Sequence, residues 1–335
     1  MDPTAKRKID HLNIIRRDPE VDRSKNYFDG VRLRHRALPE VDLSAIDPSL
    51  QLFGKRLDFP LLISSMTGGD HEEVRRVNRN LAIAAEATGV AMGVGSQRVM
   101  FTHPPARDSF ALRLAAPNAL LFSNLGAVQL NCGFDIEHCR EAVSVLEADG
   151  IFLHLNPLQE AVQPEGDTNF AGLTARIGEI AAELKEPVIV KEIGAGISRV
   201  DAEGLMAAGI RNIDVAGSGG TSWSRIEHHR AGHDLGLIFQ DWGIPTPIAL
   251  AELSELPDLT LFASGGIRNG LDMAKAVILG ATLCGMASPF LEPAKQSPEA
   301  VIRVIEGLHR EFTTAMFLLG VADFAALQGR TDLLL

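Results

Sequence analysis

Lys191 and Glu160 are the two charged residues whose positions in the sequence most directly suggest chemistry. Lys191 follows the apolar run PVIV, so its side chain either points into a cavity mouth or pairs with an acid such as Glu192. In a cavity it could form a Schiff base or hold the negative charge of a bound cofactor ring. Glu160 lies beside Gln159 in the segment HLNPLQE, and its hard oxygen atoms suit Mg²⁺. The alternative for Glu160 is a solvated loop acid.

Two glycine-rich segments have the composition of phosphate-binding loops. They are SGGIRNG at 264–270 and GMAS at 285–288. Glycines let backbone N–H groups approach a phosphate, and the N-terminus of a following helix adds partial positive charge. The same glycines could instead serve only to turn the chain into short helices. His154 is a further candidate because it interrupts an apolar strand pattern, where a histidine is either a satisfied core residue or part of a site.

Short apolar runs alternate with amphipathic helical patterns along most of the chain. Such runs are typical of parallel strands that are covered on both faces, and helical spacing recurs between them, for example over 74–88, 139–146 and 301–312. Strands are expected to begin near Leu61, Val90, Ala119, Ile151, Val188, Asn212, Leu259 and Ala281. This repeat predicts a closed (β/α)8 TIM barrel, with an open doubly wound sheet as the alternative.

Polar or glycine-rich residues follow every expected strand. The segments are SSMTGG at 64–69, GSQR at 95–98, SNLG at 123–126, HLNPLQE at 154–160, KE at 191–192, GSGGTSW at 217–223, SGGIRNG at 264–270 and GMAS at 285–288. In a (β/α)8 barrel the active site lies at the C-terminal ends of the strands. The sequence therefore predicts an active site at that rim.

Two regions fall outside the repeat. Residues 1–50 are expected to form an N-terminal extension, and residues 51–335 a single barrel domain. The long polar interval 222–248 is expected to be a lid or an insertion over the barrel mouth. The extension is locally basic, with Lys6, Arg7, Lys8, Arg16, Arg17, Arg32, Arg34 and Arg36.

Composition narrows the class of protein. The chain has 335 residues, 46% of them hydrophobic, and a formal net charge of −11. This acidic balance argues against a nucleic-acid or membrane-surface binder, although local basic groups can still hold a small anion. The sequence shows neither a membrane-spanning apolar segment nor a secretory signal, and its three cysteines lack disulfide or zinc spacing. We therefore expect a cytoplasmic protein whose cysteines fill the core.

Several strings together resemble the type 2 isopentenyl diphosphate isomerases, a flavin-dependent family. The strings are RKIDHL at 7–12, RHRALPE at 34–40, SSMTGG at 64–69, GVGSQR at 93–98, SNLGAVQL at 123–130, HLNPLQE at 154–160, VKEIGAGIS at 190–198, AGSGGTSW at 216–223 and ASGGIRNGLDMAKAVILGA at 263–281. The resemblance runs from Arg7 to about Ser288. HLNPLQE and AGSGGTSW in one chain are highly specific, whereas other FMN barrels share SGGIRNG.

The resemblance implies a role for each matched residue. The residues that would line FMN are Ser65, Met66, Thr67, Ser96, Asn124, Lys191 and Thr221. Those that would hold its phosphate are Gly265, Gly266, Arg268, Ala287 and Ser288. The substrate diphosphate would be held by Arg7, Lys8, Ser96, Gln97 and Arg98, with His154 and Asn156 beside the diphosphate and metal. Gln159 would lie at the reacting end of the substrate, and Glu160 would hold Mg²⁺. The N-terminal extension would thus contribute to the substrate site.

The resemblance also implies the reaction, which is isomerisation of isopentenyl diphosphate to dimethylallyl diphosphate without net redox change. Reduced FMN would act as acid and base, NADPH would only pre-reduce it, and the catalytic side chains would be Gln159, Lys191 and His154. One rival is an FMN-dependent 2-hydroxy-acid oxidoreductase, which needs a histidine base that AGSGGTSW lacks. The other is a flavin-binding barrel without turnover. Barrels of this class commonly form homo-oligomers, so we expect a tetramer or an octamer.

Overall fold

A closed barrel of parallel strands forms the centre of the computed structural model, which describes residues 10–11, 13–66 and 68–335. Its strands are β3 (Leu61–Ile63), β4 (Ala91–Gly93), β5 (Leu121–Gly126), β6 (Gly150–Leu155), β7 (Val188–Glu192), β8 (Asn212–Asp214), β9 (Thr260–Ser264) and β10 (Ala281–Met286). Each strand pairs in parallel with the next, and β10 pairs with β3 to close the barrel. The strands expected from the sequence are confirmed, and closure excludes the doubly wound sheet.

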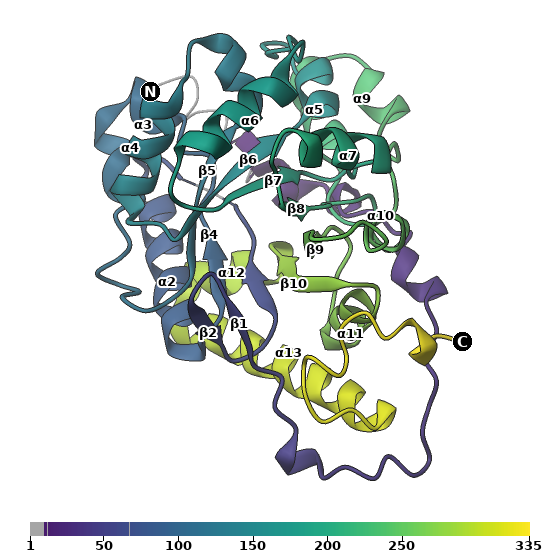
Figure 1. Ribbon diagram of the computed structural model, residues 1–335. Helices are drawn as coiled ribbons and strands as arrows, with labels where there is room; N and C mark the ends of the chain where they lie inside the picture. The colour runs from purple at the N-terminus through teal and green to yellow at the C-terminus, as the bar shows by residue number, and fades with distance from the viewer. Residues whose placement is uncertain (1–9, 12, 67) are drawn as a thin grey trace.

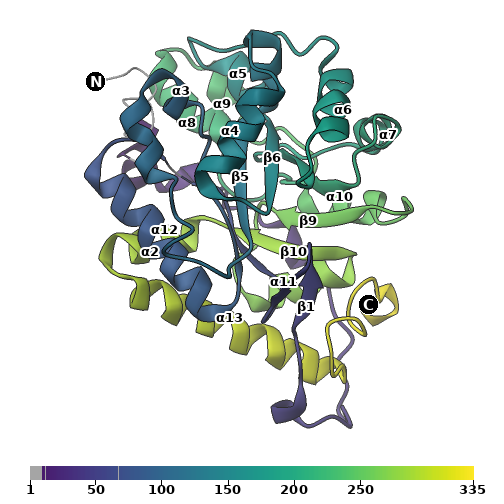
Figure 2. The ribbon, with the colours of Figure 1, turned by 60° about the vertical axis from the view of Figure 1, so that its left-hand side comes forward.

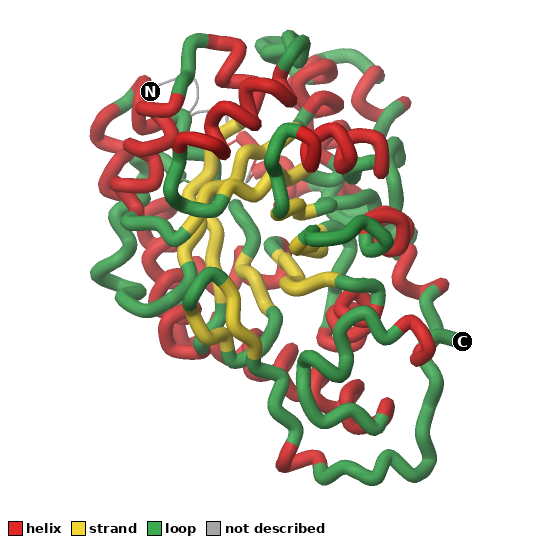
Figure 3. Tube along the Cα trace, in the orientation of Figure 1, coloured by secondary structure: helices red, strands yellow, loops and turns green. Residues whose placement is uncertain are grey.

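Helices surround the barrel (Figures 1 and 3). The longer ones are α2 (Glu72–Thr88), α4 (Ile136–Leu146), α6 (Leu173–Glu183), α7 (Arg199–Ala207), α8 (Trp223–Ala231), α10 (Thr246–Leu253), α11 (Gly270–Ile278), α12 (Ser288–Gln296) and α13 (Pro298–Leu319), and shorter ones are α3 (Val99–Thr102), α5 (Pro157–Val162) and α9 (Leu235–Ile238). Ser222, Asn269 and Ser297 each accept a backbone N–H at the start of α8, α11 and α13. These N-caps explain where the three helices begin.

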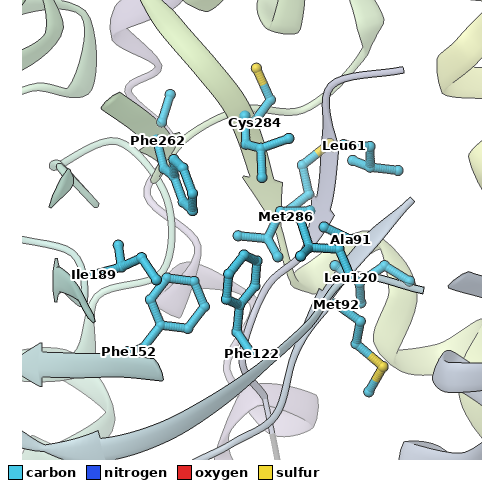
Figure 4. Close-up of a cluster of buried hydrophobic side chains, with 14 of the residues drawn as sticks. Leu61, Ala91, Met92, Leu120, Phe122, Phe152, Ile189, Phe262, Cys284 and Met286 are labelled. Atoms are coloured by element: carbon cyan, nitrogen blue, oxygen red, sulfur yellow. The ribbon is translucent and has the colours of Figure 1, made fainter. Parts of the chain in front are cut away.

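Aromatic side chains fill the barrel interior (Figure 4). The ring centroid of Phe122 lies 5.0 Å from that of Phe152 and 6.0 Å from that of Phe262. All three side chains are fully buried. Because each comes from a different strand, their contacts bind the strands together around one apolar centre.

A two-stranded hairpin covers the N-terminal end of the barrel. It consists of β1 (Leu50–Leu52) and β2 (Lys55–Leu57), which pair antiparallel. Phe53 at its turn contacts Phe122, with ring centroids 6.1 Å apart, and Lys55 Nζ donates to the Ala119 carbonyl at 2.9 Å, just before β5. Nothing in the sequence pattern predicted this hairpin.

The N-terminal extension crosses the rim and then runs along the outside of the barrel toward the C-terminus (Figures 1 and 2). At the rim, Asp22 forms an antiparallel bridge with Thr221. Farther along, Leu33 forms a bridge with Leu334, and the Arg36 N–H donates to the Leu318 carbonyl at 2.9 Å, near the end of α13. The extension therefore links the rim to the C-terminal segment.

The polar interval at 222–248 contains α8 and the shorter α9, and α10 begins near its end. Ser224 Oγ in α8 donates to the Gly236 carbonyl in α9 at 2.7 Å. Trp223, the first residue of α8, lines the cavity described below. The interval is therefore a helical insertion at the barrel mouth, in line with the expectation.

Two findings concern the expectations drawn from composition. No helix in the described part of the chain is long and apolar enough to cross a membrane. Cys139 and Cys284 are buried, but Cys132 is exposed, so the expectation that all three cysteines fill the core is wrong for Cys132. Cys132 is the last residue of a short 3-10 helix, and the chain turns directly after it at Gly133, whose φ is +94°.

Phe122→Ala should lower the free energy of unfolding by about 3–5 kcal/mol, because it removes a ring packed among three others and leaves a cavity. Leu114→Ala is the matched control. Leu114 is 98% exposed, so its replacement should change the free energy of unfolding by no more than about 0.5 kcal/mol. Urea titration followed by circular dichroism measures both. Equal losses in the two variants would contradict a central role for Phe122 in the core.

Candidate active site

A cavity of about 530 Å³ opens at the C-terminal ends of the barrel strands. This volume suits a small-molecule or cofactor site. The predicted site residues that line it are Ser65, Met66, Ser96, Arg98, Asn124, His154, Asn156, Gln159, Glu160, Lys191, Thr221, Gly265, Gly266, Arg268, Ala287 and Ser288. The predicted residues Arg7, Lys8 and Thr67 lie outside the described part of the chain.

Gln97 is the described site residue that the structure does not bring to the cavity. It is fully buried, with Nε2 donating to the Ala142 carbonyl at 2.9 Å and Oε1 accepting the Asn124 N–H at 3.0 Å. Its neighbours Ser96 and Arg98 do line the cavity. Gln97 therefore points into the wall, where it fixes the backbone beneath Asn124.

Lys191 lies one residue before the end of β7, and two buried side chains hold its ammonium group. Its Nζ donates to Asp214 Oδ2 at 2.6 Å and to Ser264 Oγ at 2.7 Å, and Ser264 Oγ donates to Asp214 Oδ1 at 2.7 Å. Lys191 and Ser264 line the cavity. A buried ion pair persists only when such hydrogen bonds offset the loss of water. The predicted pairing of Lys191 with an acid is confirmed, but that acid is Asp214 and not Glu192.

Glu192 instead supports the loop that follows β7. Its Oε2 accepts the N–H groups of Ile193 and Gly194, each at 2.7 Å, as well as that of Gly196 at 3.2 Å. Burial raises the pKa of Glu192 to about 7, although these backbone N–H groups oppose the rise. Because Ile193 and Gly194 line the cavity, Glu192 shapes the site through the backbone.

Asn124 connects three strand ends under the cavity. Its Nδ2 donates to Ser65 Oγ at 2.8 Å and to the Val94 carbonyl at 3.1 Å. Its Oδ1 lies 2.8 Å from His154 Nδ1, so that ring nitrogen carries the hydrogen. His154 lines the cavity, and its contact with Asn124 fixes the orientation of its ring, so it is not an isolated core histidine.

Glu160 lies in the first turn of α5, and its carboxylate is buried. It accepts hydrogen bonds from Asn156 Nδ2 at 2.8 Å, from the Asp167 N–H at 2.7 Å and from Gln163 Nε2. The alternative of a solvated loop acid is therefore wrong. Asn156 Oδ1 is a buried acceptor without a hydrogen-bond partner within the described chain. Buried acceptors are rarely left unpaired, so a ligand at this position would complete the site.

Gln159, also in α5, is fixed at both ends of its amide. Its Oε1 accepts from Asn156 Nδ2 at 3.1 Å, and its Nε2 donates to Glu227 Oε1 in α8 at 2.8 Å. The same Glu227 oxygen lies 2.9 Å from His11 Nε2, and Arg230 donates to the other oxygen at 2.5 Å. Burial opposes ionisation of Glu227, but these partners outweigh it and lower its pKa to about 2.

Arg98 forms an ion pair with Asp167, with NH1 2.8 Å from Oδ2. Gln129 Nε2 donates to the same oxygen at 3.2 Å. Both partners are partly exposed, so the pair is a weak one that an anionic ligand could replace. Arg98 therefore presents a cation close to Glu160, whose carboxylate accepts the Asp167 N–H.

The glycines after β8 and β9 bring two loops into backbone contact. Gly265 and Gly266 have φ values of +93° and +77°, and a Cβ on Gly265 would lie 2.1 Å from the Gly217 carbonyl oxygen. A Cβ on Gly220 would lie 2.7 Å from the Gly266 nitrogen. Beside them, α12 begins at Ser288, and its first residue lines the cavity. This arrangement fits a phosphate held by backbone N–H groups and a helix N-terminus. The glycines therefore do more than turn the chain into short helices.

Arg268 lies beside these loops but is already paired with acids. Its Nε is 2.8 Å from Asp272 Oδ2, and NH2 is 2.6 Å from Asp29 Oδ1. These side-chain hydrogen bonds raise the pKa of Arg268 further above its ordinary value. Arg268 thus ties the N-terminal extension to the predicted phosphate site.

Three acids of the site were not singled out from the sequence. Asp214 closes β8, and an acid at the end of an apolar strand was a usable signal. Asp167 and Glu227 lie in a loop and on a helix, where acids are commonly solvated, so nothing distinguished them. Within the described residues, no group of three or more His, Cys, Asp or Glu side chains could hold a metal ion by itself.

Comparisons with known proteins define the class. A family model described as FMN-dependent dehydrogenase matches residues 167–332. The flavin-binding domain of baker's yeast flavocytochrome b2 is similar in fold, with a TM-score of 0.67 and 18% identity over 92% of this chain and 76% of that chain. A mandelate oxidase variant has a TM-score of 0.61 and 20% identity over 90% of this chain and 87% of that chain. The barrel therefore shares its fold with these flavin-dependent (β/α)8-barrel proteins.

Relatives of higher identity define the family. The isopentenyl-diphosphate delta-isomerase of Paracoccus zeaxanthinifaciens is 56% identical over 98% of this chain and 97% of the relative. Those of Hydrogenovibrio crunogenus and Pyrococcus furiosus are 49% and 43% identical over 97% of this chain, and over 96% and 85% of the relative. The chain belongs to the isopentenyl-diphosphate delta-isomerase family, as its motifs indicated.

Glu227→Gln should flatten the dependence of stability on acid pH. The pKa of Glu227 falls from 4.5 to about 2 in the folded chain, so its ionised form stabilises the fold fully above pH 4.5 and progressively less as pH falls toward 2. Over that window the wild type should lose on the order of 3 kcal/mol more than the variant. Denaturant titrations at a series of pH values measure the loss. The exposed Glu306→Gln should retain the wild-type slope; parallel curves for wild type and Glu227→Gln would contradict the assignment.

Proposed function

We propose that this chain isomerises isopentenyl diphosphate to dimethylallyl diphosphate with reduced FMN and without net redox change. The proposal rests on the lining of one cavity, where glycine loops and the start of α12 suit a phosphate at one end, and Arg98 with Glu160, a candidate Mg²⁺ ligand, suits a diphosphate at the other. Ser288 and the glycine loop follow β10 and β9, whereas Glu160 follows β6, which lies directly opposite β10 in the closed strand order. Two phosphorylated ligands, a cofactor and a substrate, therefore fit with their reacting parts between the two ends. The names of the relatives support the same reaction.

FMN is proposed to bind with its phosphate at the glycine loops and the start of α12. Its ring would contact residues from five strand ends, namely Ser65, Met66, Ser96, Asn124, Lys191 and Thr221, with Thr67 as a further predicted contact. When bound and reduced, FMN supplies the acid and base that shift the double bond, and NADPH is the proposed source of its electrons. Lys191 would place an ammonium group against the negative charge of the reduced ring.

The substrate diphosphate is proposed to bind at the opposite end. Arg98 would exchange Asp167 for a phosphate oxygen, and Asn156 Oδ1 would gain a partner in the metal ion or its water. Glu160 would be a protein ligand of Mg²⁺, with phosphate and water oxygens completing the shell. His154 and Ser96 lie on the same side, and Arg7 and Lys8 would close over the diphosphate. This binding lies away from the reacting carbons and fixes their position.

Gln159 is proposed to define the reacting end of the substrate. Because Asn156 and Glu227 hold both ends of its amide, the group cannot rotate freely against the alkene. Trp223 and Met66 contribute apolar surface to the lining. An alkene is a weak base, so its protonation requires a site that excludes water while supplying nearby negative charge.

A second candidate is an FMN-dependent 2-hydroxy-acid oxidoreductase, which the family-model match to FMN-dependent dehydrogenases favours. Such an enzyme needs a histidine base at the rim to take the proton of the substrate hydroxyl. The segment 216–223 after β8 reads AGSGGTSW and contains no histidine.

We also propose a cytoplasmic homo-oligomer, either a tetramer or an octamer. It is proposed to bind neither membranes nor nucleic acid, and the net charge of −11 supports the absence of nucleic-acid binding.

Anaerobic incubation of the purified protein with isopentenyl diphosphate, FMN, NADPH and Mg²⁺ tests the proposal. Dimethylallyl diphosphate should form, and a parallel sample without reductant should give none, because only reduced FMN supplies the acid and base. Product is measured by phosphorus nuclear magnetic resonance. FMN that is bound and bleached by NADPH but yields no product would contradict isomerisation and favour the oxidoreductase or a barrel without turnover.

Glu160→Gln should raise the Mg²⁺ concentration needed for half-maximal activity by roughly tenfold or more, because the neutral amide is a poorer ligand for a hard cation. Asp258→Asn, which changes an acid outside the cavity lining, is the control. Activity is titrated with Mg²⁺ at saturating substrate. An unchanged requirement in Glu160→Gln would place the metal elsewhere.

A further inference from the structure

Lys191 does not present a lone positive charge to the cavity. We propose that Lys191 and Asp214 act as a charge-balanced pair, in which Asp214 is a positioning residue that limits how strongly Lys191 favours the reduced flavin. The inference rests on the FMN-binding part of the proposed function and not on the identity of the substrate.

The pair has the geometry of a rigid unit. Lys191 Nζ lies 2.6 Å from Asp214 Oδ2, and Asp214 has no exposed side-chain surface. Asp214 Oδ1 accepts from Ser264 Oγ at 2.7 Å and from the Ala216 N–H at 3.2 Å. The three side chains come from β7, β8 and β9, so the barrel itself fixes their separation. Two of the three ammonium hydrogens are directed to Asp214 and Ser264, which leaves one for the cavity side.

Asp214, and not the neighbouring Glu192, is the acid in direct contact with the Lys191 ammonium group. Glu192, the next residue along β7, has its carboxylate turned to the backbone N–H groups of Ile193 and Gly194. Unit charges a few ångströms apart in a poorly hydrated interior interact strongly. The field that Lys191 exerts on a ring in the cavity is therefore reduced by the carboxylate behind it.

The consequence is a definite order of flavin reduction potentials. Two electrons and one proton convert the neutral oxidised ring of FMN to its anionic reduced form, so the net charge beside the ring biases the equilibrium. Asp214→Asn leaves a net charge of about +1 at the pair, Lys191→Gln leaves about −1, and the double variant leaves about zero, as in the wild type. The midpoint potential should be highest in Asp214→Asn, lowest in Lys191→Gln, and close to wild type in the double variant.

The test measures the two-electron midpoint potential of bound FMN by anaerobic photoreduction against a reference dye, after absorbance has shown that FMN is bound. At the wild-type midpoint, Asp214→Asn should raise the ratio of reduced to oxidised flavin about tenfold or more, and Lys191→Gln should lower it comparably. The double variant should return to within about threefold of wild type. Ser264→Ala removes a hydrogen bond but no charge, so its shift should be smaller than that of Asp214→Asn.

The double variant keeps the test decisive even if a single variant fails to fold, because it leaves no unpaired buried charge. A double variant whose potential stays at that of Lys191→Gln would overturn the inference, as would an unmoved potential in Asp214→Asn. A purely structural role for Asp214 predicts no such recovery. The measurement contains no isoprenoid, so a failed isomerisation assay would leave its outcome unaffected.

Discussion

Closure of the eight-stranded sheet is the constraint on which the rest of the structure depends. Pairing of β10 with β3 joins strands whose residues are more than two hundred positions apart in the chain. Because all strands run in one direction, their C-terminal ends meet at a single rim. Phe122, Phe152 and Phe262 fill the interior beneath that rim, so polar side chains at the strand ends converge on a cavity with a solid apolar floor.

The site contains several acids, yet it is proposed to bind two anionic ligands. Each acid has hydrogen-bonding partners of its own within the protein. Asp214 is paired with Lys191, Asp167 with Arg98, and Glu227 with His11 and Arg230. Glu160 and Glu192 accept backbone N–H groups. A protein of net charge −11 can therefore hold anions locally, since short-range hydrogen bonds decide the potential inside a cavity more than distant surface charges do.

The sequence predicted the barrel and most of the cavity lining because both depend on local patterns. Apolar runs mark the strands, and polar residues after each run mark the rim. Hydrogen bonds between residues far apart in the chain have no local sequence pattern. Gln159 bonds to Glu227, and Glu227 bonds to His11, which lies 216 positions away. Side-chain direction is equally hidden, since Gln97 lies between two lining residues yet points into the wall. The hairpin beneath the barrel is short, and its pattern resembles that of an ordinary loop.

Deuterium incorporation during turnover tests most directly whether the reduced cofactor serves as an acid and base rather than as a redox agent. The reaction would be run anaerobically in D₂O with pre-reduced FMN and isopentenyl diphosphate, while the flavin absorbance is recorded. The proposed chemistry predicts deuterium in dimethylallyl diphosphate with many turnovers per flavin and no change in flavin absorbance. Product without deuterium, or oxidation of one flavin for each product formed, would contradict it.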